Sequence, residues 1–140
     1  MEYKVLGIPS EEEKTIRVEV FMDEQGFKSE FDELDEPGKS VHLLFFEKGE
    51  AVAVCRMYPA TEPGEWSIGR VAVRKSYRGG GRGREIMLAA EKECIARGAK
   101  KLSLSAQVQA QGFYESCGYT AEGDTYLDEH CPHIHMTKVL

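Results

Sequence analysis

The chain has 140 residues, of which 41% are hydrophobic and 30% charged, and a formal net charge of -6. This length predicts a single domain, 1–140, with enough apolar side chains for a core. The negative charge argues against a nucleic-acid binder, which normally carries a basic face, and no run approaches the ~20 apolar residues of a membrane span. Residues 1–10 lack the basic region and apolar run of a secretion signal, so we expect a cytoplasmic protein.

The hydrophobic pattern predicts an α/β (α+β) domain with the element order βαβββαβαββ. A strand is expected at 3–8, then a helix at 10–25 that Ser10 and Glu13 open as a capping box. An acidic segment at 30–36 follows. The remaining elements are strands at 41–46, 51–58 and 66–74, a helix at 82–97, a strand at 101–105, a short helix at 109–117 and strands at 119–122 and 133–139.

A glycine-rich loop joins the strand at 66–74 to the helix at 82–97, and it reads Arg78-Gly79-Gly80-Gly81-Arg82-Gly83. Such a loop lets backbone N–H groups converge on one anion, and the helix N-terminus adds partial positive charge. No Lys-Ser or Lys-Thr follows the glycines, so the loop is not a P-loop. The dinucleotide fingerprint fails as well, because the last position counted from Gly79 is Arg84. We therefore expect a different pyrophosphate-binding loop.

Read as R-x-x-G-x-G and together with residues 71–77, this loop resembles the cofactor motif of the GNAT superfamily of N-acetyltransferases. The resemblance implies a single GNAT-type domain, with a mixed, mostly antiparallel sheet flanked by helices. It also implies acetyl-CoA as the co-substrate and no metal. The backbone expected along the pantetheine arm is that of Val71, Ala72 and Val73, and the residues expected around the pyrophosphate are Arg78, Gly79, Gly80, Gly81, Arg82, Gly83 and Arg84.

The segment 111–119 is similar to the F-Y-x-x-x-G-[FY] segment of the same superfamily. There the tyrosine hydroxyl lies beside the cofactor sulfur, which implies that Tyr114 is the general acid. A narrower resemblance, to the ElaA/YjcF-like branch, implies that Gln107 contacts the cofactor at the end of a strand. This branch resemblance rests on residues 17–25, 32, 35, 42, 105–107, 111–114 and 132–134.

The general base has three candidates. Glu24 ends the first helix, which in this fold borders the substrate cleft. His133 begins the last strand and carries an imidazole, the side chain that exchanges a proton most readily near neutral pH. His42 is the weaker candidate, because a single histidine on a strand is usually packed. A water relay without a single base is the remaining alternative.

The acceptor is expected to be an amine of a small molecule or a peptide. The carboxylates at 30–36 could attract a cationic acceptor through their field, or they could form an ordinary solvated loop. Four residues near the end of the sequence are of types that bind metals, namely His130, Cys131, His133 and His135. Ligands so close in sequence rarely complete a tetrahedral site alone, so we expect no metal there. A catalytically weak acyl-CoA-binding sensor or interaction module is the alternative function, and both a monomer and a homodimer remain open.

Overall fold

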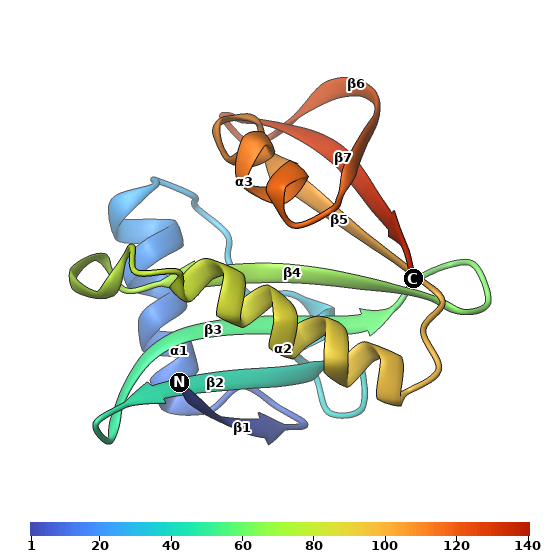
Figure 1. The fold of residues 1–140 in the computed structure, drawn as a ribbon. Helices are drawn as coiled ribbons and strands as arrows, with labels where there is room; N and C mark the ends of the chain where they lie inside the picture. Colours follow the sequence, from blue (N-terminus) through green and yellow to red (C-terminus); the bar gives the residue numbers. More distant parts are fainter.

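The computed structural model describes residues 1–140 as one seven-stranded sheet with helices on both of its faces (Figure 1). The strand order is β1-β2-β3-β4-β5-β7-β6. The strands are β1 (Glu2–Leu6), β2 (Val41–Glu47), β3 (Glu50–Pro59), β4 (Glu65–Val73), β5 (Lys101–Gln107), β6 (Thr120–Asp128) and β7 (Cys131–Val139). The helices are α1 (Glu11–Arg17), the π-helix η1 (Val18–Glu24), α2 (Arg82–Ala96) and α3 (Gln111–Ser116), with short 3-10 turns η2 (Glu33–Asp35), η3 (Lys75–Tyr77) and η4 (Val108–Ala110).

The sheet is mixed and mostly antiparallel, as the sequence predicts. Its one parallel pair, β4 with β5, runs only from Glu65–Ser67 against Lys101–Ser103. Beyond Ser67 the two strands diverge, and β5 carries β6, β7 and α3 away from β4 (Figure 1). One edge of the second half of β4 is therefore left without a partner strand.

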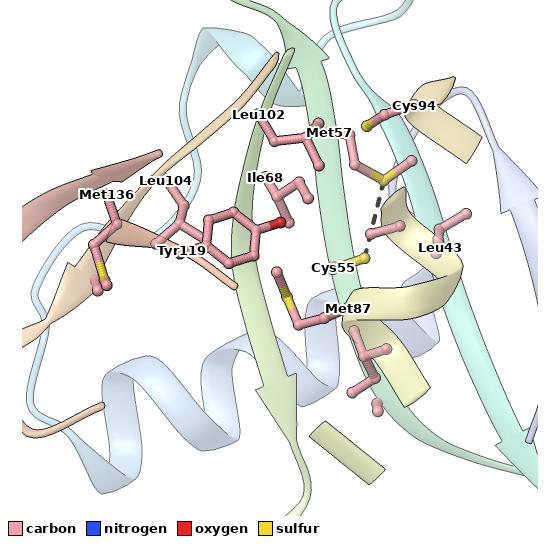
Figure 2. Packing of buried hydrophobic residues seen from close by; sticks show 14 of the residues in the cluster. Leu43, Cys55, Met57, Ile68, Met87, Cys94, Leu102, Leu104, Tyr119 and Met136 are labelled. Carbon is pink, nitrogen blue, oxygen red and sulfur yellow. Dashed lines mark hydrogen bonds between the residues drawn. The ribbon is translucent and has the colours of Figure 1, made fainter. Parts of the chain in front are cut away.

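Two hydrophobic clusters cover the two faces of the sheet. Helix α2 presents the predicted face of Ile86, Met87, Ala90 and Cys94 to one face, and all four are buried there. Figure 2 shows Met87 and Cys94 from α2 beside sheet residues such as Met57, from β3, within this cluster. On the other face, α1 and η1 contribute Ile16, Val20 and Phe21 to the second cluster.

The first helix is α-helical only as far as Arg17, and the predicted helix at 10–25 continues as the π-helix η1. Ser10 caps it, since its side chain accepts a hydrogen bond from the Glu13 N–H at 3.2 Å. The predicted capping box is incomplete, because the Glu13 side chain turns instead to Arg17 and His42. The spacing of apolar residues cannot distinguish an α-helix from a π-helix in this segment, because Ile16, Val20 and Phe21 would face the core in either form.

The last two strands are longer than the sequence predicts. Strand β6 continues past 122 to Asp128, and β7 already begins at Cys131. Gly123 and Pro132 are unfavourable in strands, and this is why the expected strands were shorter. The structure accommodates Gly123 by a register shift between Glu122 and Tyr126. Of the helices, none is both long and apolar enough to cross a membrane.

Candidate active site

The glycine loop is shaped to receive an anion. Gly79, Gly80 and Gly81 all have left-handed backbone conformations, with φ of 88°, 64° and 79°. Their N–H groups donate to no atom of the protein. They lie immediately before α2, whose first turn also leaves N–H groups without intrahelical acceptors. The loop therefore gathers free donors at a helix N-terminus, which is the arrangement that binds phosphate.

Three arginines in or directly after the loop lie beside these donors, and two of them already face carboxylates. Arg78 donates to both Glu24 oxygens at 2.5 and 2.6 Å, and Arg82 makes a similar two-bond contact with Glu47. Arg84 instead donates to the Ser116 carbonyl at 3.0 Å. The cations at the loop are thus oriented by the protein itself.

A groove of about 560 Å³ runs from the loop along the free edge of β4 to α3. Its volume lies within the ~300–1,000 Å³ range typical of small-molecule sites. Of the residues predicted to hold the cofactor, those on the groove are Val71, Ala72, Val73, Arg78, Gly79, Gly81, Arg82, Gly83 and Arg84. Gly80 and Gln107 do not line it. Gln107 reaches it indirectly, because its side chain donates at 2.8 Å to Gln25, which does.

A second, smaller cavity opens between the diverging β4 and β5, with free space of about 90 Å³. Tyr114 and Val71 line both this cavity and the groove. Tyr114 projects from α3, and its hydroxyl makes no hydrogen bond to the protein. Burial raises the pKa of Tyr114 to about 12, so its phenol stays protonated at neutral pH. Tyr114 therefore offers a proton at the junction of the two spaces.

His133 lies in the same small cavity, on β7 and opposite Gln107 of β5. Its side chain is 7% exposed, and its Nδ1 lies 2.9 Å from the Cys131 carbonyl oxygen. A carbonyl can only accept, so Nδ1 carries the proton in this contact, and in the neutral ring Nε2 therefore carries the lone pair. Tyr126 stacks on the ring at a centroid distance of 6.1 Å, and Phe27 meets it edge-on at 6.4 Å. The ring is thus fixed in position, and Nε2 has no protein partner.

The other two candidate bases lie elsewhere. Glu24 lines neither the cavity nor the groove, and it faces Arg78 at the phosphate end. The hydrogen bond from Arg78 lowers the pKa of Glu24, which makes this carboxylate a weaker base. His42 is fully buried on β2, where its Nδ1 contacts Glu13 at 2.8 Å. Of the three, only His133 reaches the cavity that contains Tyr114.

The acidic segment at 30–36 is largely neutralised by the protein's own arginines. Glu30 and Asp35 both bind Arg17, at 2.8 and 2.7 Å. Asp32 forms a two-bond contact with Arg56 at 2.8 and 2.9 Å. Burial opposes ionisation of Asp35, but the Arg17 guanidinium outweighs it and holds the pKa of that carboxyl well below its usual range. Three of the five carboxylates thus form structural ion pairs, and the attraction of a cationic acceptor by this segment stays a prediction.

The histidine and cysteine tail does not converge on a metal site. His130 contacts the Gln25 carbonyl at 2.8 Å, and the Cys131 thiol points to the Pro132 carbonyl. The one group of three ligand atoms within 4.8 Å of one another is Glu13, Asp35 and His42. Arg17 already donates to both of its carboxylates, at 2.9 and 2.7 Å, and so occupies the place of a cation.

Sequence reasoning missed several residues of the small cavity, among them Arg70 on β4 and Asp128 at the end of β6. Phe27, which follows the first helix, was missed too. These residues come from segments distant in sequence, and neither spacing nor a local motif links them. One local signal for Arg70 was the preceding Gly69, because an isolated glycine within a predicted strand often marks a bulge.

The comparisons with known proteins agree with this geometry. The model of a family described as an acetyltransferase (GNAT) domain matches residues 8–140. The chain belongs to the GNAT family. ElaA of Escherichia coli (strain K12) is 31% identical to this GNAT chain over 126 residues, which are 88% of this chain and 82% of ElaA. A UPF0039 protein of Synechocystis sp. is 36% identical over 140 residues, covering 94% of this chain and 87% of that protein.

Solved structures give the same result for the GNAT fold. The crystal structure of Escherichia coli ElaA is similar with a TM-score of 0.84 and 29% identity, and 98% of each chain is covered. An acyl-CoA N-acyltransferase from Pseudomonas aeruginosa has a TM-score of 0.85 and 27% identity, with 99% of each chain covered. The expected resemblance to the GNAT superfamily and to ElaA is confirmed, and so is the single GNAT domain with its mixed sheet.

Proposed function

We propose that this GNAT protein is an N-acetyltransferase that moves an acetyl group from acetyl-CoA directly to an amine of a small molecule or a peptide. One observation carries the proposal: Tyr114 and Val71 border both the groove and the small cavity. A reactive acyl group at the inner end of the groove would lie next to an amine in the cavity. Holding the two reactants in contact supplies much of the rate enhancement of a direct transfer.

The groove has the chemistry that a CoA molecule requires. The free N–H groups of Gly79, Gly80 and Gly81 suit its pyrophosphate. The unpartnered edge of β4 beyond Ser67 offers backbone groups to the amides of a pantetheine arm, much as it would to an added strand. When bound, acetyl-CoA supplies an activated acyl group and a thiol leaving group.

The acyl group is expected to be short. The free space beside Tyr114 is only about 90 Å³. This is well below the ~300–1,000 Å³ of a typical small-molecule site. It has to hold the acyl group and part of the acceptor together. A two-carbon acyl group fits this limit better than a long chain.

Tyr114 and His133 divide the proton transfers. Tyr114 keeps its proton because burial raises its pKa, and it donates this proton to the departing thiolate. The unprotonated Nε2 of His133 accepts a proton from the amine as the new C–N bond forms. The hydrogen bond to the Cys131 carbonyl holds the ring in the tautomer that leaves Nε2 free.

A thiol-release assay tests this proposal. Purified protein is mixed with acetyl-CoA and a panel of small amines and short peptides, and free CoA is measured with and without each acceptor. We expect release that depends on the acceptor and that falls in Tyr114→Phe. Tight acetyl-CoA binding without acceptor-dependent release across the panel would favour an acyl-CoA-binding module instead.

A further inference from the structure

Arg70, in the wall of the small cavity, has an unusual backbone conformation. Its φ is 51°, a left-handed value that residues other than glycine rarely adopt. The other two non-glycine residues with positive φ, Lys48 and Glu129, lie in the tight turns of hairpins. Arg70 alone lies within a strand, next to the register shift between β3 and β4. Such outliers persist where the surrounding structure enforces them, and they cluster at binding sites.

The protein holds the Arg70 guanidinium in place and leaves one donor free. Its Nε lies 2.8 Å from the Glu30 carboxylate, and its Nη2 donates to the Glu30 carbonyl at 3.0 Å and more weakly to Asp32 at 3.4 Å. Its Nη1 has no protein partner. The side chain is 27% exposed and lines both the small cavity and an adjoining recess of about 220 Å³. Arg70 is thus pre-oriented to donate to a ligand.

Arg56 lines the adjoining recess but offers no accessible donor to it. It is 3% exposed, and its Nη1 and Nη2 atoms are taken by Asp32 and Asp35. Its Nε has no hydrogen-bond partner but is buried away from the surface of the recess. Arg56 therefore adds positive charge to the wall of the recess, and Arg70 supplies the free donor.

A carboxylate and an imidazole line the same space. Asp128 is exposed and lines the cavity and the recess, and its carboxylate makes no ion pair or hydrogen bond within the protein. His133 also lines both and keeps Nε2 free. The cavity therefore combines the free Nη1 donor of Arg70 with an unpaired carboxylate. A ligand that carries both an anionic and a cationic group matches this pattern.

We infer that the acceptor is a small amino carboxylate, such as an amino acid, whose carboxylate binds Arg70 and whose amine lies between Asp128 and His133. The inference rests on the proposed function and specifies its acceptor. A polyamine fits less well, because it would bring a second cation against Arg70 and leave the free Nη1 without an acceptor. The recess of about 220 Å³ is also small for a large peptide or an amino sugar oligomer.

Matched substrates test the inference in the wild-type protein. A panel of amino acids is compared with the corresponding amino acid amides, which keep the amine and lose the negative charge. We expect kcat/KM for the better amino acids to exceed that for their amides by roughly 10- to 100-fold, the range of a hydrogen-bonded charge contact. Equal values for acids and amides, or a preference for the amides, would overturn the inference and leave the acetyltransferase function standing.

Variants of Arg70 test whether this side chain causes the preference for amino acids over their amides. Arg70→Gln removes the charge, and Arg70→Gly removes the side chain at a backbone conformation that glycine adopts without strain. In both variants, the ratio of kcat/KM for an amino acid to kcat/KM for its amide should fall towards one. Because both values are measured on the same variant, the ratio does not depend on how much of the protein is folded. Arg97→Gln, which breaks a surface contact with Glu93 outside the site, is the matched control and should keep the ratio. An unchanged ratio in both Arg70 variants would contradict the assignment.

A different result would overturn the proposed function and the inference together, namely that CoA release does not depend on the acceptor for any amine tested.

Discussion

Glu24 and Arg78 face each other through two hydrogen bonds of 2.5 and 2.6 Å. The Glu24 carboxylate therefore lies beside the glycine loop, at a place that suits an anion. Glu24 is the last residue of η1, and Arg78 also donates to the Val73 carbonyl at 3.0 Å. The role of Glu24 as a base stays a prediction. Its contact with Arg78 leads us to propose a different role, in which it holds Arg78 until a phosphate replaces it.

Glu24→Gln should therefore tighten cofactor binding. The carboxylate competes with phosphate for Arg78, and removing its charge relieves that competition. Exposed ion pairs contribute at most about 1 kcal/mol, so we expect the Kd for CoA to fall by roughly two- to fivefold in calorimetry, with kcat retained. Asp23→Asn is the matched control, because Asp23 is adjacent and exposed. A large loss of kcat with unchanged affinity would instead restore Glu24 as the base.

Gly83→Asp should abolish cofactor binding. A Cβ at this position would lie 3.0 Å from Phe113 Cζ, and the new carboxylate would enter the phosphate site. Phe113 packs on Tyr114 at a centroid distance of 5.0 Å, so its displacement would also disturb the proposed acid. Gly7→Asp adds the same charge at an open position and should bind CoA normally. If Gly83→Asp kept its CoA affinity in calorimetry, the loop would not be the phosphate site.

Tyr114→Phe should lower kcat by about 100-fold, at the low end of the range for general acid catalysis, while the Kd for acetyl-CoA stays nearly the same. Because the pKa of Tyr114 is raised to about 12, the phenol remains protonated throughout the usual assay range. Tyr114 should therefore cause no loss of activity up to about pH 10, and any alkaline decline below that pH should persist in the variant. An unaffected kcat would remove its role as the acid.

His133→Asn should also lower kcat by about 100-fold. An asparagine amide can replace Nδ1 as the donor to the Cys131 carbonyl, but it supplies no base. The loss should shrink for acceptors of low basicity, because the nitrogen of their adduct is more acidic and depends less on a base as the C–N bond forms. A purely structural role would lower kcat equally for all acceptors, and rates across a series of amines of different basicity distinguish the two.

Asp35→Asn should destabilise the fold by about 3 kcal/mol at neutral pH, because it leaves part of the charge of buried Arg17 unmatched. Since the folded-state pKa of Asp35 is lowered, its contribution is fully present above the ordinary carboxyl range, begins to decline as the pH falls below about 4, and is lost completely only at much lower pH. Denaturant unfolding should therefore show the gap between wild type and variant narrowing progressively as the pH falls from about 4 towards 2. Asp124→Asn, at an exposed position of β6, should show no such gap. A gap that is constant with pH would contradict the lowered pKa.

Much of the fold could be predicted from local signals. The apolar spacing of the helix at 82–97 predicted its buried face, and the composition of the loop at 78–83 indicated the position of the groove where we propose that CoA binds. The π-helix could not be predicted, because apolar spacing does not distinguish it from an α-helix in this segment. Strand β6 was underestimated because Gly123 is tolerated there by an irregular register.

On the acceptor side of the site, the sequence predicted only His133. Arg70 and Asp128 join it because β4 and β5 diverge after Ser67, and that divergence is a property of the whole sheet. The ion pairs of the acidic segment could not be predicted for the same reason. Its carboxylates look free in the sequence, and only the fold brings Arg17 and Arg56 to them.

The most direct test of the account follows the acetyl group itself. Acetyl-CoA labelled with carbon-13 in its acetyl group is incubated with the protein and amino acid acceptors, and the label is followed by NMR. The account predicts that the label appears in an N-acetyl amide of the acceptor, at a rate that falls in Tyr114→Phe and His133→Asn. Label that stays on CoA with every acceptor, or appears only as free acetate, would contradict it.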